Sequence, residues 1–362
     1  MTKKLLAVFL AFVLCFGMFG CEEDTIVDRK SEISVTEKST FTPSVTETAE
    51  TEPSSPTPGD TETTVPVSDE DISGESSPIL YKVTDTNGNV LWLFGSIHVG
   101  REDYYPLPDY VLDAFESSDA LAVEFDTVSF ENDLGSQIKA LQMLMYTDGT
   151  TIKDHISAEV YSRAVEILEE NTIYNSMMDY YLPSLWANFI DNCAYEKIGA
   201  NSELGIDLHF IERAMDCNKE ILEIESAEFQ FGMLGGFSEE LQVCLLEGSI
   251  ESYEYLDEMK EEVNVMMDLW ASGDEKKFSE YLNSEEDIAD PQEALLYKEY
   301  NDAMMVSRNA EMTKYAENAL KSGKEVFICV GAAHIVGDGA IAEELRLLGY
   351  TVERVKRDRN MT

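Results

Sequence analysis

Two short runs of large apolar residues in this chain each end in the pattern Gly-x-x-His. The first run, at 91–94, leads into Gly-Ser-Ile-His and ends at His98, and the second, at 326–330, leads into Gly-Ala-Ala-His and ends at His334. A short, continuous apolar run that is bounded by glycine is typical of a strand buried on both faces. The pattern therefore predicts two core strands, each with a histidine just past its carboxyl end, where open α/β sheets place their ligands.

The rest of the chain predicts strands at both ends and helices between them. The Asn-Gly pair at 87–88 separates apolar runs at 79–84 and 90–97, which is the pattern of a β-hairpin. Further strands are predicted at 120–125, 220–225, 324–330 and 350–355, and helices at 108–117, within 129–216, within 237–322 and at 339–348. We therefore expect an α/β (α+β) fold in which N- and C-terminal strands form a mixed central β-sheet with an inserted helical cap. The paired histidine strands also predict a weak two-fold pseudosymmetry.

The beginning of the chain has the residue order of a secretory signal. Two lysines are followed by an apolar stretch at 5–19, and small residues lead up to Cys21. Such a stretch is too short for a membrane-spanning helix and is typical of a cleaved signal, and its ending resembles a bacterial lipoprotein box. We predict a signal peptide at 1–20 and lipidation of Cys21, with ordinary cleavage near Gly20 as the alternative.

Residues 21–78 are dominated by Ser, Thr, Glu and Pro. A segment with so few apolar residues cannot bury enough surface to offset the entropy lost on ordering, so we predict a disordered tether. The domain that folds is expected at 79–357. The signal and the tether together place it at the cell membrane, lipid-anchored on the extracytoplasmic face.

The chain has a formal net charge of −45, from 71 acidic and 26 basic residues. A field of this sign excludes nucleic acid as a partner class and argues against direct adhesion to anionic lipid. It favours the attraction of cations, including metal ions, although solubility in a salty or acidic exterior explains the same charge. The cysteines show neither Cys-x-x-Cys nor zinc-finger spacing, and an exported protein allows one or two disulfides among Cys193, Cys217, Cys244 and Cys329, so we assign no pairing.

His98, His334 and Glu124 each lie at or just past the end of a predicted strand. Two imidazoles and a carboxylate are a common ligand set for a divalent ion that keeps an open position for water. Such an ion lowers the pKa of its bound water and polarises a scissile carbonyl. The alternatives are that each histidine is a hydrogen-bonded core or loop residue and that Glu124 is solvent-exposed. Because unpaired burial of a carboxylate is costly, we expect a metal ion or Arg308 as the partner of Glu124.

Further polar residues are candidates for the same site. Glu225 ends another predicted strand and is the candidate general base for a metal-bound water, with Glu223 as the weaker alternative. Asp207 is either a supporting residue of the site or a helix N-cap. Arg308 and Asn309 interrupt a helical pattern. We assign both to the catalytic group, with Arg308 clamping a carboxylate or stabilising an oxyanion unless it forms a plain surface ion pair.

Taken in chain order, these motifs resemble the TraB/GumN family over essentially all of the domain. The likeness is carried by Gly95-Ser96-Ile97-His98, Tyr105-Pro106-Leu107-Pro108, Val123-Glu124, Gly205-Ile206-Asp207, the stretch 223–230, Arg308-Asn309 and Gly331-Ala332-Ala333-His334. The resemblance implies an α/β core in which both histidines and a strand-end glutamate converge on a metal-dependent site. Gly95 and Gly331 are then supporting residues at the two strand ends.

This family is related to the Tiki proteins, which are membrane-linked metalloproteases, and more distantly to erythromycin-esterase-like and haem-associated ChaN-like folds. The resemblance implies a metal-dependent hydrolase that cleaves a peptide or protein substrate with a metal-activated water, the ion being Mn²⁺, Co²⁺ or Zn²⁺. The alternative is a non-catalytic protein that binds and sequesters a pheromone-like peptide, a small molecule or haem. Stoichiometric binding of a divalent ion that requires His98 and His334 separates the two hypotheses.

Overall fold

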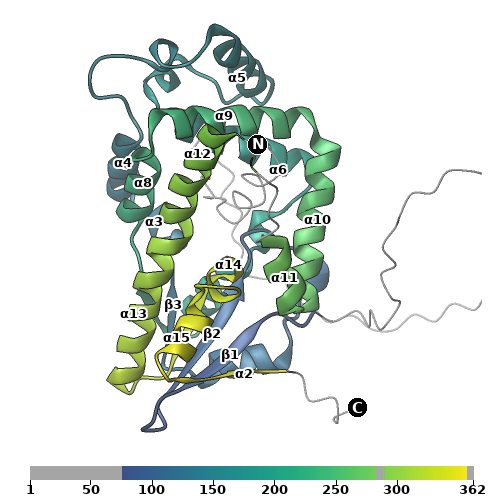
Figure 1. Ribbon diagram of the computed structural model, residues 1–362, viewed down its shortest axis with the longest axis vertical. Coiled ribbons are helices and arrows are strands. Elements are labelled where there is room, and N and C mark those ends of the chain that lie inside the picture. The colour runs from purple at the N-terminus through teal and green to yellow at the C-terminus, as the bar shows by residue number, and fades with distance from the viewer. Residues whose placement is uncertain (1–75, 283–287, 289, 357–362) are drawn as a thin grey trace, which may run out of the picture. The chain divides into compact units, whose positions relative to one another are not determined.

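The computed structural model of the protein describes residues 76–282, 288 and 290–356. The predicted signal peptide, Cys21 and all but the last residues of the predicted tether lie outside these residues. Within them, strands and helices follow one another in the order that the sequence predicts (Figure 1). The α/β fold with a mixed central sheet and a helical cap is thereby confirmed. No helix in the described ranges is long and apolar enough to cross a membrane.

The strands are β1 (Leu80–Thr84), β2 (Val90–Ser96), β3 (Ala120–Val123), β4 (Glu220–Glu223), β5 (Val326–Gly331) and β6 (Thr351–Arg354). They form one sheet in the order β4-β3-β5-β2-β1-β6. Strands β4, β3, β5 and β2 run parallel, whereas β1 is antiparallel to both of its neighbours. The two histidine strands, β2 and β5, are therefore adjacent at the centre of the sheet. The predicted two-fold pseudosymmetry does not extend beyond these two strands. The other neighbour of β2 is β1, which is antiparallel to it, whereas the other neighbour of β5 is β3, which is parallel to it.

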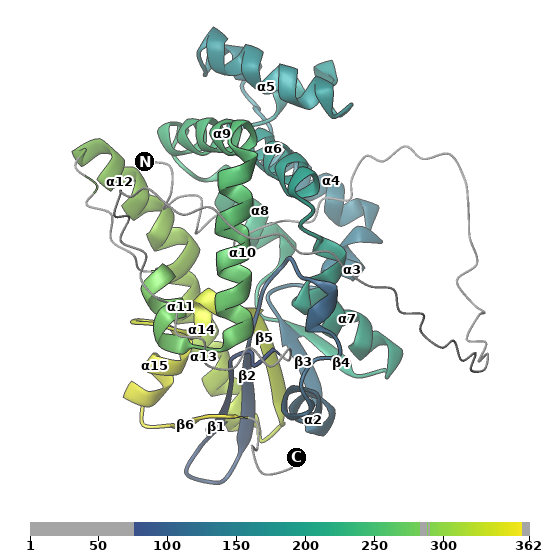
Figure 2. The same ribbon diagram turned by 90° about the vertical axis from the view of Figure 1, so that its right-hand side faces the viewer.

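Helices cover both faces of the sheet and build the cap. The α-helices are α2 (Asp109–Ser117), α3 (Thr127–Glu131), α4 (Leu134–Met143), α5 (Ala158–Glu170), α6 (Pro183–Ile198), α7 (Ile206–Asp216), α8 (Ala227–Gly235), α9 (Glu239–Glu254), α10 (Leu256–Ser272), α11 (Glu275–Leu282), α12 (Pro291–Asn301), α13 (Ser307–Ser322), α14 (Ala332–Ile335) and α15 (Ile341–Leu347). A π-helical turn, η5 (Asp302–Val306), joins α12 to α13. Figure 2 shows α2 and α7 on one side of the sheet and α13 and α15 on the other.

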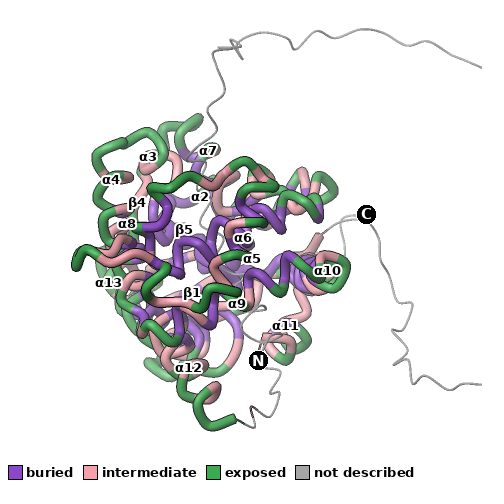
Figure 3. The backbone as a smooth tube through the Cα atoms, turned by 90° about the horizontal axis from the view of Figure 1, so that it is seen from above, coloured by how far each residue is buried: buried purple, intermediate pink, exposed green. Residues whose placement is uncertain are grey.

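An aromatic cluster fixes α2 and α7 on the sheet. The rings of Phe94 in β2 and Phe327 in β5 stack with centroids 5.6 Å apart. Phe210 of α7 lies 5.4 Å from Phe94 and 5.0 Å from Phe327, and Phe115 of α2 lies 5.1 Å from Phe210. Strand β5 is buried along its whole length, whereas α4 is largely exposed (Figure 3). Burial on both faces explains the continuous apolar run of β5 and holds the strand ends rigidly.

The cap contains a buried carboxyl group that no cation among the described residues neutralises. Asp191 of α6 is 5% exposed, and a hydrogen bond from Ser249 of α9 reaches it. Its Oδ2 atom has no hydrogen-bond partner in the part of the chain that the structure describes. Burial raises the pKa of Asp191 to about 8, from an ordinary value of 3.8. Because ionising a buried carboxyl is costly, Asp191 is protonated in the folded protein at neutral pH.

We expect Asp191→Asn to stabilise the protein increasingly as the pH rises from 5 to 8. Between pH values near 4 and 8 the folded chain holds a proton on Asp191 that the unfolded chain has released, so stability falls with rising pH. The amide cannot ionise, so the variant should melt roughly 10 °C above the wild type at pH 8, with a smaller difference at pH 5. Thermal unfolding followed by circular dichroism measures both.

Asp179→Asn is the matched control for this prediction, with the opposite sign. Asp179 is also buried, but Lys153 Nζ lies 2.7 Å and the Tyr161 hydroxyl 2.8 Å from its carboxylate. Burial raises the pKa of Asp179, yet Lys153 and Tyr161 outweigh it and hold the pKa below its usual value. Its removal should lower the melting temperature at neutral pH. For Asp191→Asn, a gain over the wild type that is equal at pH 5 and pH 8 would contradict the buried, protonated state.

Candidate functional site

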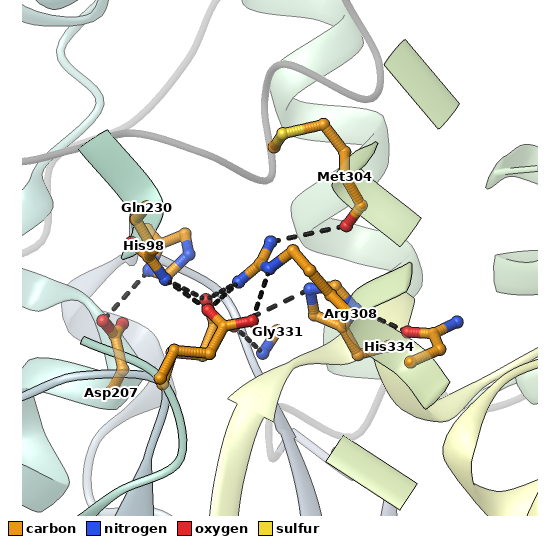
Figure 4. A network of polar contacts seen from close by, with 10 residues as sticks. His98, Asp207, Gln230, Met304, Arg308, Gly331 and His334 are labelled. Atoms are coloured by element: carbon orange, nitrogen blue, oxygen red, sulfur yellow. Dashed lines mark hydrogen bonds and ion pairs between the residues drawn. The ribbon is translucent and has the colours of Figure 1, made fainter. Parts of the chain in front are cut away.

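The carboxyl ends of four parallel strands meet at one edge of the sheet and carry four of the predicted site residues. Glu225 follows β4, Glu124 follows β3, His98 follows β2, and His334 lies in α14 directly after β5. The pairing of β3 and β4 continues up to the carboxylates, since the Glu225 amide donates to the Glu124 carbonyl at 2.8 Å. Parallel neighbours end side by side, so the topology alone gathers these side chains. Figure 4 shows the network, with His98 and Asp207 at one end and His334 at the other.

Arg308 of α13 clamps both glutamates. Its Nε and Nη2 atoms donate to the two carboxylate oxygens of Glu225 at 2.8 Å each, and Nη2 also donates to Glu124 Oε2 at 2.5 Å. The Arg308 side chain is 1% exposed and that of Glu225 is 6% exposed. A planar guanidinium suits this forked geometry, which the ammonium of lysine cannot reproduce. The alternative of a surface ion pair for Arg308 is therefore wrong.

Glu124 is buried and held on every side. Besides Arg308, the backbone amide of Gly331 donates to its Oε1 at 2.9 Å and Gln230 Nε2 donates to its Oε2 at 3.2 Å. Burial raises the pKa of the Glu124 carboxyl, but Arg308 outweighs it, so the pKa lies well below its usual range. Glu124 is therefore ionised, and the alternative of solvent exposure is wrong because the residue is 9% exposed.

His334 is a neutral imidazole with a fixed tautomer. Its Nδ1 lies 2.7 Å from Asn309 Oδ1, while Asn309 Nδ2 donates to the carbonyl of Gly339 at 3.1 Å. The amide oxygen of Asn309 must therefore accept from His334, which places the proton on Nδ1. Burial and the Arg308 charge lower the pKa of His334 to about 3. Nε2 thus carries an available lone pair, 3.9 Å from Glu124 Oε1.

His98 is oriented in the same way by a carboxylate. Its Nδ1 lies 3.0 Å from Asp207 Oδ2. Burial lowers the pKa of His98, but Asp207 and then Glu124 outweigh it and bring the pKa to about 9. Asp207 is the second residue of α7, whose N-cap is Gly205, so the alternative of an N-cap role for Asp207 is wrong. Both histidines therefore direct Nδ1 at a supporting side chain, which leaves Nε2 for the site.

Two glycines permit the close approaches that build this edge. A Cβ at Gly95 would lie 2.8 Å from Ile335 Cδ1 and 2.9 Å from Ala332 Cα, so α14 packs directly on β2. A Cβ at Gly205 would lie 2.7 Å from the His98 carbonyl oxygen. The second contact brings the start of α7, and with it Asp207, onto His98. Gly331 acts instead through its backbone amide, which binds Glu124.

Two features of the network were not predicted from the sequence. Gln230 of α8 is 1% exposed and bridges the glutamates, donating to Glu225 Oε2 at 2.8 Å as well as to Glu124. The π-helical turn η5 places the carbonyl of Met304 3.4 Å from Arg308 Nη1. The sequence does carry a signal for Gln230, because it is a polar residue in an otherwise largely apolar helix. Sequence gives no signal for a π-turn, although such turns are frequent at functional sites.

A pocket of about 60 Å³ opens beside the network. His98, Glu124, Asp207 and Gln230 line it on the polar side, and its apolar walls include Phe125, Phe130 and Phe231. Asp207 Oδ1 is buried and has no hydrogen-bond partner among the described residues. An unsatisfied carboxylate oxygen at a pocket is a place for a water or a ligand. Four other predicted site residues do not line this pocket: Glu225, Arg308, Asn309 and His334.

The atoms that would bind a metal ion are the Nε2 atoms of His98 and His334 and a carboxylate oxygen of Glu124. With a pKa of about 9, the His98 imidazole is protonated at neutral pH and would have to release its Nε2 proton to the solvent on binding the ion. The chemistry of this set fits a divalent ion, because metal-binding histidines commonly donate the other ring N–H to a carboxylate or carbonyl, as both do here. The described residues contain no group of three or more His, Cys, Asp or Glu side chains already gathered at metal-binding spacing. In the structure each imidazole has its Nδ1 atom held by a side-chain oxygen, and the Glu124 carboxylate is directed at Arg308.

Comparisons with known proteins agree with the extent of this domain. A family model described as the TraB/PrgY/gumN family matches residues 79–354. Two relatives, from Escherichia coli (strain K12) and Shigella flexneri, are each described as uncharacterized protein YbaP. Each is 27% identical to this chain over 256 residues, which cover 70% of the chain and 87% of the relative. No solved structure matches the chain significantly.

Proposed function

The chain belongs to the TraB/PrgY/gumN family, and from that premise we propose that it is a metal-dependent hydrolase that cleaves peptide bonds. The observation that carries the proposal is the matched orientation of two imidazoles. His98 and His334 come from adjacent strands, each ties Nδ1 to a side-chain oxygen, and each leaves Nε2 for a ligand. A histidine with a purely structural role does not require a second histidine beside it whose Nδ1 atom is held in the same way.

In the proposed site, His98 Nε2, His334 Nε2 and Glu124 hold a divalent ion. When bound, the ion supplies an acidified water and a Lewis acid for the scissile carbonyl. Asp207 and Asn309 keep the imidazoles in the tautomer that presents Nε2. Arg308 neutralises the buried glutamates, so that the two carboxylates can lie close together without strong repulsion.

Within this proposal the general base is Asp207 and not Glu225, which was the candidate from the sequence. Both oxygens of Glu225 accept hydrogen bonds from Arg308, so we assign Glu225 to positioning Arg308. Asp207 lines the pocket, and we assign its carboxylate to accept the proton of a water held there. This assignment places proton transfer on the same carboxylate that orients His98.

The pocket suggests the kind of residue that lies next to the cleaved bond. Its volume of about 60 Å³ compares with about 150 Å³ for a cavity that accepts benzene. Phe130 and Phe231 stack at its wall with ring centroids 5.4 Å apart. We propose that a small apolar side chain of the substrate enters here. The signal and the lipidated Cys21 that the sequence predicts support the further proposal that this activity lies on the outer face of the cell membrane.

Metal removal tests the proposal. The purified protein should contain close to one divalent ion per chain, and dialysis against a chelator should abolish cleavage of a peptide library. Cleavage should return with Mn²⁺, Co²⁺ or Zn²⁺, and the library should show which ion and which flanking residues are preferred. Peptide binding that survives chelation without any turnover would instead support the sequestering hypothesis and reject the hydrolase.

A further inference from the structure

The proposed hydrolysis gives no role to Gln230, a buried amide in the wall of the candidate pocket. Gln230 of α8 is 1% exposed and lines the pocket. The next residue, Phe231, forms part of the apolar wall of the same pocket. Figure 4 shows Gln230 on the same side of the network as His98, which also lines the pocket. Helix α8 therefore supplies one polar and one apolar wall residue.

The two glutamates fix which end of the Gln230 amide faces the network. Nε2 lies 2.8 Å from Glu225 Oε2 and 3.2 Å from Glu124 Oε2. Both carboxylates pair with Arg308 and act as acceptors. A flipped amide would set its oxygen against two carboxylate oxygens, and a carbonyl oxygen has no proton to donate. The amide nitrogen must therefore face the glutamates, so Oε1 lies on the other branch of the amide.

Oε1 of Gln230 is an acceptor that no donor in the described ranges uses. Both hydrogen bonds of the side chain are made by Nε2. In the described part of the chain, the side-chain polar atoms that are closed off from solvent without a partner do not include Oε1. Oε1 is therefore accessible, and because Gln230 is otherwise buried and lines the pocket, its open surface faces the pocket. A ligand in the pocket is expected to match this acceptor with a donor.

The size of the pocket decides which donor of a peptide comes near Gln230. A pocket of about 60 Å³ holds only a short side chain, so the backbone of that residue stays at the pocket wall. The backbone nitrogen is bonded to the same Cα as the side chain, and its N–H is the donor that a peptide offers there. An ester oxygen or a methylated nitrogen at this place would leave Oε1 desolvated and unpaired, which is costly.

We propose that Gln230 Oε1 accepts a hydrogen bond from the backbone N–H of the substrate residue whose side chain fills the pocket. Gln230 thereby selects chains with a free N–H at that residue over esters and N-methylated chains. Proline is excluded there for the same reason, because its nitrogen carries no hydrogen. The inference rests on the proposed function for the identity of the ligand as a peptide, and its test is read without turnover.

Three probes of similar shape test the donor requirement by binding alone. They are acetyl-alanine methylamide, its lactate counterpart with an ester oxygen in place of the N–H, and acetyl-N-methylalanine methylamide. In the purified protein the Nε2 protons of Gln230 give an amide NMR signal, which is identified by its absence from Gln230→Met. The first probe should shift this signal and bind about tenfold more tightly than either of the other two.

Gln230→Met and Gln242→Met localise the effect. Gln230→Met removes the acceptor, so the three probes should bind this variant equally. Gln242 of α9 is also buried, but its Nε2 donates to the Phe237 carbonyl at 2.9 Å and its Oε1 accepts from Ser184 at 3.2 Å. Gln242→Met loses bonds within the protein only and should keep the preference. A purely structural Gln230 would weaken the binding of all three probes alike in Gln230→Met, without any preference in the wild type, and that result would count against the proposal.

Peptide cleavage separates this inference from the proposed function. In a cleaved library peptide, an ester oxygen in place of the N–H of the residue in the pocket should lower kcat/KM about tenfold in the wild type and not in Gln230→Met. Absence of all cleavage would reject the hydrolase, and the probe titration would still decide the role of Gln230. Equal affinity of the wild type for the three probes, or a preference that survives in Gln230→Met, would overturn the inference. The first of these outcomes needs no variant, so it holds even where Gln230→Met does not fold.

Discussion

Replacing Arg308 with methionine should destabilise the folded protein severely. The change removes the cation between Glu124 and Glu225 and leaves two carboxylates buried, with Arg308 itself 1% exposed in the wild type. Breaking a buried ion pair by removing one partner costs about 3–5 kcal/mol, and in this variant both pairs are broken. Urea unfolding of the purified protein at pH 7 should show the loss as a lower midpoint at a similar slope, or as failure to fold.

A rescue separates the charge effect from loss of packing. In Arg308→Met with Glu124→Gln and Glu225→Gln, no buried charge remains at these three positions, so most of the lost stability should return. Arg163→Met is the control at the surface, where Arg163 pairs with Glu254 and Glu166 at 38% side-chain exposure. That variant should lose no more than about 1 kcal/mol. A triple variant no more stable than Arg308→Met would show that shape, and not charge, makes Arg308 necessary.

His98→Ala and His334→Ala should each abolish metal binding and reduce peptide hydrolysis by at least about three orders of magnitude, as removal of an essential catalytic group does. Each substitution deletes one of the two Nε2 donors that the proposed function requires. Equilibrium dialysis with the divalent ion measures the first effect and initial rates with a cleaved library peptide measure the second.

His155 is the matched control for these two substitutions. His155 bonds to Thr150 and Glu239, remote from the network, and His209 packs on the ring of Tyr105. His155→Ala should retain metal and activity within about twofold. Asn309→Leu keeps the His334 imidazole but removes its support, so metal affinity should fall roughly 10–100-fold, as expected when a supporting partner is lost. Full metal binding by His334→Ala would refute the proposed ligand set.

Much of the fold follows from local pattern. The Asn-Gly turn, the hairpin, the buried strands β2 and β5 and the helical middle were all predicted with errors of a few residues at their ends. These elements depend on near-neighbour physics: side-chain periodicity, turn chemistry and burial on one or both faces. The pairing of β1 with β6 and the order of strands in the sheet depend on long-range contacts, which a single sequence does not encode locally.

The candidate site likewise combines residues that the local sequence pattern predicts with residues whose roles depend on tertiary packing. The positions of His98, Glu124 and His334 at strand ends were predicted, because a polar residue after an apolar run is visible in the sequence. The burial of Arg308 was not, because one arginine in a polar helix gives no sign of which face it occupies. Gln230 and the π-turn at 302–306 were missed, since their roles exist only once α8 and α13 approach the sheet.

The sequence by itself determined that two Gly-x-x-His strands end in histidines, that acidic residues follow two other strands, and that the chain resembles one family. Only the tertiary structure decided that β2 and β5 are neighbours, that Arg308 holds both glutamates, and that each imidazole has a supporting oxygen on Nδ1. The physical reason is that hydrophobic pattern and turn propensity act over a few residues. The pairing of buried charges acts between residues that are as many as 184 positions apart.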